Sequence, residues 1–393
     1  MNTRNQEYDV CIIGGGITGS LLAYQFISSG FTCCIVERGQ ISQGSTSQST
    51  ALLQYELDVS LLDLTCKIGE DGAAFAYAET LRSLHDIRHL NNELHNSFDF
   101  KWVGSLYLAD NDFDAATLHD EDLLKRRLGF LSKYLTAADL HNQYGITAKG
   151  GIESQEAAQI NPIALTNSLI QYLTVKGLVV FENEEANIIP DAQSNIVATS
   201  SRIIKSSLLI IASGYKAMDY IDKKAVSIVV NRTFVVKGKS HYLKSHAHET
   251  LLWETIRPYF YLRSMGEGEY ALGGGDIPIN YAPRSAELLS KKTDEILKRF
   301  YTYFPDADFE VDSTLDAVFV ESADSMPILY KVEAFKNCYT VLGCGGNGIL
   351  FSTWAARALT EYMQGISDKS FNLLKPERLY NNAEPTRSLL ALA

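Results

Sequence analysis

The chain has 393 residues, of which 46% are hydrophobic and 21% charged, which suits roughly two to three domains of ordinary globular composition. Its 35 basic and 47 acidic residues give a formal net charge of -12. An acidic chain without a basic stripe disfavours nucleic acid or an anionic membrane surface as a partner. The first ten residues lack the apolar core of a secretory signal, and no apolar run has the length of a membrane span. We therefore expect a cytoplasmic protein with no transmembrane segment.

The first predicted elements form a βαβ unit. The apolar run Tyr8–Ile13 predicts a strand, and apolar side chains at helical spacing predict a helix over Ile17–Ser28. Gly30 ends this helix where a left-handed residue is needed, and Phe31–Val36 predicts a second strand. A strand, a glycine turn, a helix and a second strand within about thirty residues are typical of a dinucleotide-binding unit.

The turn of this unit reads Gly14-x-Gly16-x-x-Gly19. The first glycine permits the tight turn, the second lets the backbone approach a pyrophosphate, and the third lets the helix pack closely on the strand. The N–H groups and the dipole of the helix N-terminus then attract the diphosphate. Glu37, at the end of the second strand, lies where an acid binds the adenosine ribose and disfavours the 2′-phosphate of NADP. The fingerprint alone leaves NAD and FAD open.

The rest of the chain shows two kinds of pattern. Segments of α/β character occupy its start, middle and end, whereas short alternating strands typical of an antiparallel sheet follow residue 227. We predict an α/β fold in which a Rossmann-like nucleotide-binding domain (1–90, 145–225 and 320–393) carries an inserted, mainly antiparallel β substrate-binding domain (91–144 and 226–319). The further predicted elements are a helical stretch to about 94, strands 105–108, 179–181 and 207–212, a helix over 161–176 opened by Asn161-Pro162, strands 227–236, 250–253, 259–263 and 270–272, a helix over 285–303, a strand over 339–342 and a helix over 349–363.

Sequence resemblance separates the two cofactors. Glu37-Arg38-Gly39, followed by the loop GSTSQSTA at 44–51, resembles the loop after the second strand in FAD-dependent amine and amino-acid oxidoreductases of the D-amino-acid oxidase superfamily, such as glycine and sarcosine oxidases. The loop is even more similar to that of flavin-dependent glycerol-3-phosphate dehydrogenases. In these families it lies under the diphosphate and beside the flavin, although such residues also cap helices.

Three further segments match the superfamily in the right order. LIIASG at 209–214 resembles its strand with an Ala-Thr-Gly turn, and RPYFYLR at 257–263 with LGGGD at 272–276 resembles its substrate-domain strands. GCGGNGI at 343–349 resembles its C-terminal flavin turn, where a helix N-terminus stabilises the negative charge of the reduced flavin. The resemblance covers nearly the whole chain and implies that the cofactor is FAD.

The fingerprint and the resemblance together imply which residues bind FAD. They are Gly14, Gly16, Ile17, Thr18, Gly19, Glu37, Arg38, Gly44, Ser45, Thr46, Ser49, Thr50, Ala51, Ala186, Ala212, Ser213, Gly214, Gly345, Gly346, Asn347, Gly348 and Ile349. Covalent attachment of the flavin through Cys344 is a less favoured alternative. We expect no metal, because His85 and His89, four apart on a predicted helix, lack a suitable third ligand.

The substrate side departs from the superfamily pattern. Members that act on amino acids commonly hold the carboxylate with an arginine, which in several of them precedes a Thr-x-Asp-x-x-Pro segment, whereas Val320 and Glu321 stand at that place in this chain. Arg257 or Arg263 could take over this role. Glu321 could instead bind a cationic group, which would favour an amine substrate, or be a solvated surface charge.

Tyr259 and Tyr261 alternate on one predicted strand and therefore share a face, where they line either a substrate pocket or a packed core. The resemblance implies a small-molecule substrate whose C–N bond, in an amine or amino acid, is oxidised by hydride transfer to flavin N5. Electrons then pass to oxygen or another acceptor. Two alternatives stay open: oxidation of a C–O bond in a 2-hydroxy acid or glycerol phosphate, and a binding or assembly factor without turnover. The candidate catalytic residues are Tyr259, Tyr261, Arg257, Arg263 and Glu321.

Overall fold

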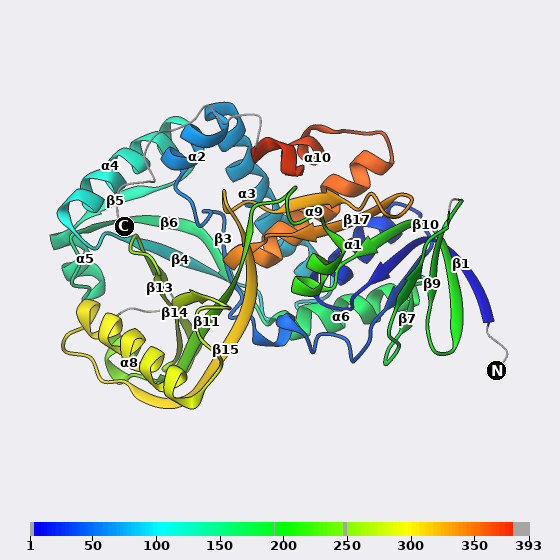
Figure 1. Ribbon diagram of the computed structural model, residues 1–393. Helices are drawn as coiled ribbons and strands as arrows, with labels where there is room; N and C mark the ends of the chain where they lie inside the picture. Colours follow the sequence, from blue (N-terminus) through cyan, green and yellow to red (C-terminus); the bar gives the residue numbers. More distant parts are fainter. Residues whose placement is uncertain (1–3, 192, 247–249, 380–393) are drawn as a thin grey trace.

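Two β-sheets organise the chain, sheet A at the right of Figure 1 and sheet B at the left. The computed structural model describes residues 4–191, 193–246 and 250–379. The centre of sheet A is parallel, whereas sheet B is mainly antiparallel. Successive stretches of the sequence alternate between the two sheets, so each sheet is assembled from segments far apart in the chain.

Sheet A has the strand order β16-β17-β10-β1-β2-β7, with β9 and β8 added beside β10. The strands from β17 to β7 run parallel, and β16 pairs antiparallel at one edge. The strands are β1 (Arg4–Ile13), β2 (Cys33–Val36), β7 (Val179–Phe181), β8 (Asn187–Ile189), β9 (Asn195–Ala198), β10 (Arg202–Ile211), β16 (Ile328–Lys331) and β17 (Cys338–Leu342).

The predicted βαβ unit is confirmed. The helix α1 (Ile17–Ser28) begins and ends where the apolar spacing indicated, and it buries Leu21, Leu22 and Phe26 in the core beside sheet A. Gly30 follows it with φ +87°, in the left-handed region that favours glycine. Because β1 and β2 are parallel, the turn before α1 and the end of β2 meet at the carboxyl edge of the sheet, where α/β folds bind ligands.

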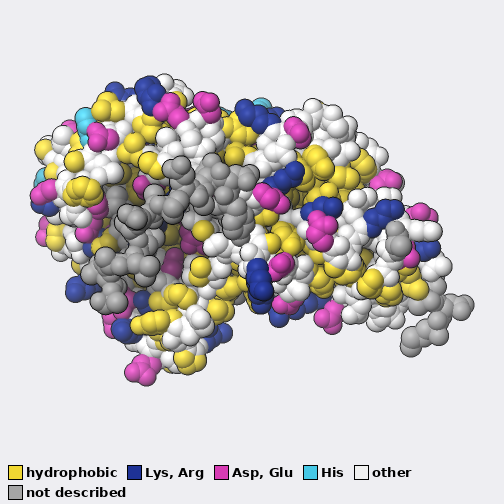
Figure 2. All heavy atoms as spheres, turned by 45° about the horizontal axis from the view of Figure 1, so that its top comes forward, with side chains coloured by type: hydrophobic (Ala, Val, Ile, Leu, Met, Phe, Trp, Pro, Cys, Tyr) yellow, Lys and Arg dark blue, Asp and Glu magenta, His cyan; other side chains and the backbone are white. Residues whose placement is uncertain are grey.

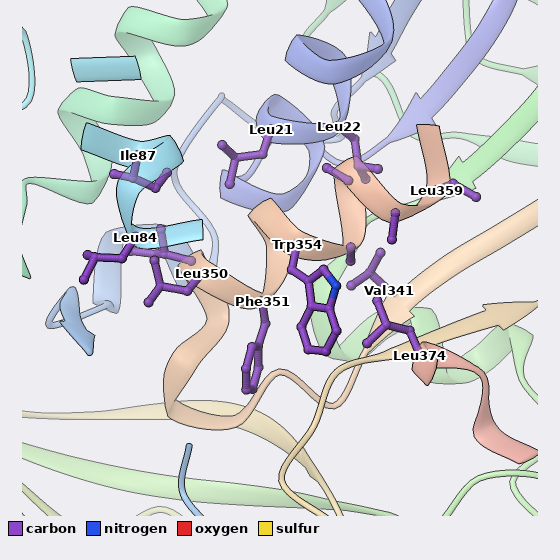
Figure 3. Close-up of a cluster of buried hydrophobic side chains, with 14 of the residues drawn as sticks. Leu21, Leu22, Leu84, Ile87, Val341, Leu350, Phe351, Trp354, Leu359 and Leu374 are labelled. Carbon is purple, nitrogen blue, oxygen red and sulfur yellow. The ribbon is translucent and has the colours of Figure 1, made fainter. Parts of the chain in front are cut away.

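A hydrophobic core fixes the helix that follows β17. Figure 3 shows side chains from α1, α3 (Glu70–Glu93), β17 and α10 (Lys369–Leu374) gathered around Phe351 and Trp354 of α9 (Gly348–Met363). Both aromatic side chains are fully buried. Burial of one large apolar side chain contributes about 1.5–3 kcal/mol, so this packing holds the first turn of α9 firmly beside α1.

Sheet B has the strand order β15-β11-β14-β13-β12-β4-β6-β3, with β5 added beside β6. All of its strand pairs are antiparallel except β4 with β12. The strands are β3 (Leu52–Gln54), β4 (Lys101–Leu108), β5 (Lys133–Thr136), β6 (Gly150–Gln159), β11 (Ile228–Lys239), β12 (Leu251–Glu254), β13 (Phe260–Gly266), β14 (Glu269–Pro278) and β15 (Glu310–Ser322).

One face of sheet B is covered by α8 (Ala286–Tyr303) (Figure 1). Phe300 of this helix shares a buried cluster with Phe260 and Leu262 of β13. Side chains alternate along a strand, so Tyr261 and its alternate neighbours at 259 and 263 point away from α8. The opposite face of sheet B therefore presents the predicted catalytic tyrosines.

The predicted fold class is confirmed, but sheet membership departs from the predicted domain boundaries. β3 and β6 belong to sheet B, although the prediction assigned 1–90 and 145–225 to the nucleotide-binding domain. β15 crosses the predicted boundary at 320. β6 reads GGIESQEAAQ, and these small and polar residues do not alternate with apolar ones, so its place is decided by pairing with β3, β4 and β5. The domain division itself stays a prediction.

Shorter helices complete the fold. Within the part of the chain that the structure describes, no helix is both long and apolar enough to cross a membrane. On the face in Figure 2, acidic and basic side chains are interspersed. The remaining helices are α2 (Leu61–Ile68), α4 (Asp112–Arg127), α5 (Ala137–Tyr144), α6 (Pro162–Val175) and α7 (His241–His246).

Candidate active site

The turn between β1 and α1 leaves no room for side chains at two of its glycines. Gly14 has φ +115°, and a Cβ there would lie 2.4 Å from the carbonyl oxygen of Ala212. A Cβ at Gly19 would lie 2.0 Å from the carbonyl oxygen of Gly14. Only glycine therefore permits this packing, and the close approach of Ala212 brings the turn after β10 beside the fingerprint.

Two hydroxyl contacts join the start of α1 to other predicted cofactor segments. The backbone N–H of Ile17 donates to Thr46 Oγ1 at 3.0 Å, which attaches the 44–51 loop to the helix N-terminus. Thr18 Oγ1 lies 2.8 Å from Ser352 Oγ on α9. The first segment that the sequence analysis assigned to FAD thus contacts α9, the helix that begins in the last assigned segment.

Glu37 lies at the end of β2, as predicted. Its Oε2 accepts the backbone N–H of Gly15 at 2.8 Å, and its Oε1 accepts that of Gly39 at 2.8 Å, so the carboxylate is held at the carboxyl edge of sheet A. The N–H of Glu184 donates to the carbonyl of Glu37 at 3.0 Å. Ala186 follows in this segment and is half-buried.

These residues fit FAD. Ser213 Oγ is buried and, among the residues described, has no hydrogen-bond partner, so it is available to a ligand. A glycine turn at a helix N-terminus provides donors for a diphosphate, and Glu37 provides an acceptor for ribose hydroxyls. Other predicted contacts differ in exposure: Thr46 and Ala51 are buried, whereas Arg38, Gly44, Ser45, Ser49 and Gly214 are exposed.

The predicted C-terminal flavin turn, Gly345–Asn347, leads directly into α9. The backbone N–H of Gly346 donates to Asp58 Oδ2 at 3.1 Å. Glu321, in β15, pairs with Cys344 through an isolated bridge. The turn therefore presents a backbone donor to an anionic group, which is the property that the resemblance implies for a flavin contact.

Tyr259 approaches this turn from sheet B, and Tyr261 lies beside it, with ring centroids 6.1 Å apart. A Cβ at Gly346 would lie 3.2 Å from Tyr259 Oη. Tyr261 Oη lies 3.4 Å from Oγ1 of Thr50 in the predicted flavin loop. Burial raises the pKa of both phenols above its ordinary value, so both remain protonated donors at neutral pH.

Both candidate arginines donate to backbone carbonyls. Arg257 donates to the carbonyl of Asp58. Arg263 donates to the carbonyls of Thr50 and Ile160, and burial lowers the pKa of its guanidinium to about 10, which leaves it charged at neutral pH. The contacts of Arg263 tie the 44–51 loop to sheet B and argue against the role of substrate anchor that the sequence analysis considered for it.

Two carboxylates that the sequence analysis missed join Glu321 here. Burial, and then the charges of Asp58 and Glu321, raise the pKa of Asp276 to about 7. Burial and Asp58 also raise the pKa of Glu321, whose side chain accepts a hydrogen bond from Asn231 Nδ2 at 3.3 Å. Asp276 ends the segment LGGGD, so resemblance had marked its surroundings, whereas nothing in the sequence near Asp58 signals a site.

A family model identifies the class of protein. The model described as FAD dependent oxidoreductase (DAO) matches residues 9–362. The chain therefore belongs to this family, and its cofactor is FAD.

Individual relatives share less than a third of their residues with this chain over the longer matches. The putative Rieske 2Fe-2S iron-sulfur protein YhfW of Bacillus subtilis is 27% identical over 245 residues, which cover 61% of this chain and 47% of that protein; the match spans about half of this relative. Gamma-glutamylputrescine oxidoreductase of Escherichia coli is 21% identical over 375 residues, which cover 92% of this chain and 84% of that protein.

Glycine oxidase from Geobacillus kaustophilus shares the fold, with a TM-score of 0.76 at 18% identity, over 92% of this chain and 96% of that chain. A shorter match, 46% identical over 52 residues, is found with aerobic glycerol-3-phosphate dehydrogenase of Staphylococcus haemolyticus. The resemblance to the D-amino-acid oxidase superfamily is confirmed, while the individual FAD contacts stay predictions.

Proposed function

We propose that this protein oxidises a C–N bond of an amine or amino acid. The observation that carries the proposal is the meeting of Tyr259 and Glu321 at the turn Gly345–Asn347, with Tyr261 beside Thr50 of the 44–51 loop. Polar side chains of sheet B thus lie against the two segments that the family resemblance assigns to the flavin. Support also comes from the named activities of the relatives, gamma-glutamylputrescine oxidoreductase and glycine oxidase.

The residues that would hold FAD are distributed over the carboxyl edge of sheet A. The N-terminus of α1 would bind the diphosphate and Glu37 the ribose, and the N–H of Gly346 would face the flavin. Bound FAD supplies a hydride acceptor, and oxygen or another acceptor takes the electrons onward.

The chain's own task is to bind and orient the amine and to handle its proton. An ammonium group must lose a proton before a hydride can leave the adjacent carbon. Asp276, whose pKa burial and neighbouring carboxylates raise to about 7, exchanges a proton readily at neutral pH. Tyr259 and Tyr261 are donors that orient the substrate, and no separate nucleophile is needed.

The test is anaerobic reduction of the FAD-loaded protein, followed as loss of flavin absorbance. We expect a primary or secondary amine or an amino acid at millimolar concentration to bleach the flavin, whereas 2-hydroxy acids and glycerol phosphate leave it oxidised. Bleaching by hydroxy compounds alone would move the reaction to a C–O bond. A flavin that none of these compounds reduces would point to a binding or assembly factor.

A further inference from the structure

Negative side chains dominate the sheet B side of the candidate site. Asp58 and Glu321 meet at Gly345, where a Cβ would lie 3.2 Å from Asp58 Oδ2 and 3.9 Å from Glu321 Cγ. Burial, and then the charges of these two residues, raise the pKa of Asp276, which therefore lies within electrostatic reach of both. Arg257 and Lys67 oppose them, but both donate their hydrogen bonds to backbone carbonyls. Three carboxyl groups and two cationic side chains therefore meet at this wall of the site, and the hydrogen bonds of the cations go to carbonyl oxygens.

Asp276 has an acceptor atom that the chain does not satisfy. Its Oδ1 is buried and has no hydrogen-bond partner within the described residues. Asp276 interacts electrostatically with Tyr259 and Tyr261, which places it at the same wall. A buried acceptor without a donor costs about 1–3 kcal/mol, and a ligand with an N–H donor would remove this penalty.

Asp276 and Glu321 lie at two separate places along β11. The side chain of Thr233 hydrogen-bonds Asp276, and the side chain of Asn231 donates to Glu321 at 3.3 Å. These two positions of β11 are two residues apart, a distance of about 7 Å along the strand. This wall thus has two anchoring points, with the ring of Tyr261 near Asp276. The guanidinium of Arg257 already lies over the ring of Tyr259, 4.8 Å from its centroid.

We infer that the substrate is an aliphatic amine with a second ammonium group, a diamine or polyamine, and that Asp276 and Glu321 are the residues that select it. The inference rests on the proposed oxidation of a C–N bond. Two separated carboxylates match two ammonium groups, whereas an α-carboxylate beside the reacting carbon would be repelled by this wall and would find Arg263 already engaged.

The experiment compares 1,5-diaminopentane with pentylamine, glycine and sarcosine in anaerobic reduction of the FAD-loaded enzyme. We expect the diamine to have the highest ratio of reduction rate to dissociation constant, about 10- to 100-fold above pentylamine, as one charge-assisted hydrogen bond predicts. Asp276→Asn and Glu321→Gln should each remove most of this preference. Asp276→Asn should also slow reduction by pentylamine, because Asp276 handles the substrate proton, whereas Glu321→Gln should have a smaller effect on pentylamine. The control is Asp312→Asn, because Asp312 is an exposed residue of β15 far along the strand from Glu321, and this variant should keep the preference.

Two results would overturn the inference while leaving the proposed function intact: equal ratios for the diamine and pentylamine, or fastest reduction by glycine or sarcosine. A preference that survives in both variants would also overturn it. Failure of every C–N compound to reduce the flavin would instead reject the proposed function. Because the two variants lie on different strands, either one that binds FAD and folds suffices for the comparison.

Discussion

The carboxylate of Asp58 accepts the backbone N–H of Gly346 at 3.1 Å, a contact between residues 288 positions apart in the chain. Next to it, Asn347 Nδ2 donates to the carbonyl of Glu56 at 2.8 Å. The segment after β3 is thereby bound to the turn that begins α9. An anionic side chain occupies the donor that the family resemblance assigns to the flavin, and this gives the first prediction.

Asp58 should compete with the flavin for the N–H of Gly346. We expect the Asp58→Ala apoprotein to bind FAD about two- to tenfold more tightly. In this variant the flavin no longer has to displace the hydrogen bond between Asp58 and the N–H of Gly346. Titration of the apoprotein with FAD, followed by flavin fluorescence, measures this change. Asp312→Ala should bind FAD like the parent protein, and weaker binding by Asp58→Ala would mean that Asp58 supports the flavin.

Gly14→Ala should abolish FAD binding. A methyl group there meets the carbonyl oxygen of Ala212 at 2.4 Å in a backbone with φ +115°, so the turn must move. We expect the purified variant to be colourless and to stay so when FAD is added. Gly104→Ala is the control, because its methyl group would meet no atom closer than 3.6 Å, and a yellow Gly14→Ala protein would contradict the expected role of the turn.

Asp276 should make the free energy of unfolding depend on pH. Its pKa is about 7 in the folded protein and 3.8 ordinarily. Between these values the folded state holds a proton that the unfolded state has released, so stability falls as the pH rises from about 4 to about 7. Urea denaturation of the FAD-loaded protein at pH 5 and pH 8 should show a smaller decrease for Asp276→Asn than for the parent or for Asp312→Asn. Equal decreases would contradict the raised pKa.

Arg357 on α9 should be required for stability. It is buried and pairs with Glu79 and Asp86 on α3. Arg357→Met should lower the free energy of unfolding by about 3–5 kcal/mol, because the buried carboxylate of Glu79 loses its buried cationic partner and keeps the exposed Arg82. Arg82 is the matched control: it lies 3.6 Å from the other oxygen of Glu79 but is exposed, so Arg82→Ala should change stability by less than about 0.5 kcal/mol. Chemical denaturation compares the two, and similar values would reject the pairing as a source of stability.

The flavin should be held without a covalent bond. Burial raises the pKa of the Cys344 thiol to about 12, so the thiolate needed for attachment is scarce at neutral pH. Acid precipitation should release all of the yellow colour into the supernatant, and Cys344→Ser should bind the same amount of FAD. A yellow pellet that turns white only in Cys344→Ser would show the opposite.

The sequence was sufficient to predict those elements whose structure depends on neighbouring residues in the chain. The spacing of apolar residues gave the bounds of α1, and Asn161 caps α6 by accepting the N–H of Ala164, as the Asn-Pro pair indicated. The fingerprint placed Gly14 and Glu37 correctly at one edge of sheet A, because each of these positions is dictated by the backbone of a single βαβ unit.

Long-range contacts were beyond sequence reasoning. β6 is a strand because three neighbours pair with it, and its own residues do not show it. Asp58 joins the site only because α9 and β3 are brought together by the packing of both sheets. The strand position of Arg263 suggested a ligand-binding residue. In the structure its guanidinium instead donates to the backbone carbonyls of Thr50 and Ile160. Each of these outcomes depends on segments more than one hundred residues away or on several strands at once.

The strand order of sheet A also sets when this sheet can be completed during synthesis. β1, α1 and β2 leave the ribosome long before β17 and the turn before α9, which come from residues 338–347. A nascent chain that ends at residue 300 therefore already contains the dinucleotide fingerprint. It still lacks β17, which pairs with β10, and α9, which packs on α1. Until residues up to about 363 have been translated, the apolar side of α1 has to be kept from wrong partners, and chaperone demand should be greatest over that interval.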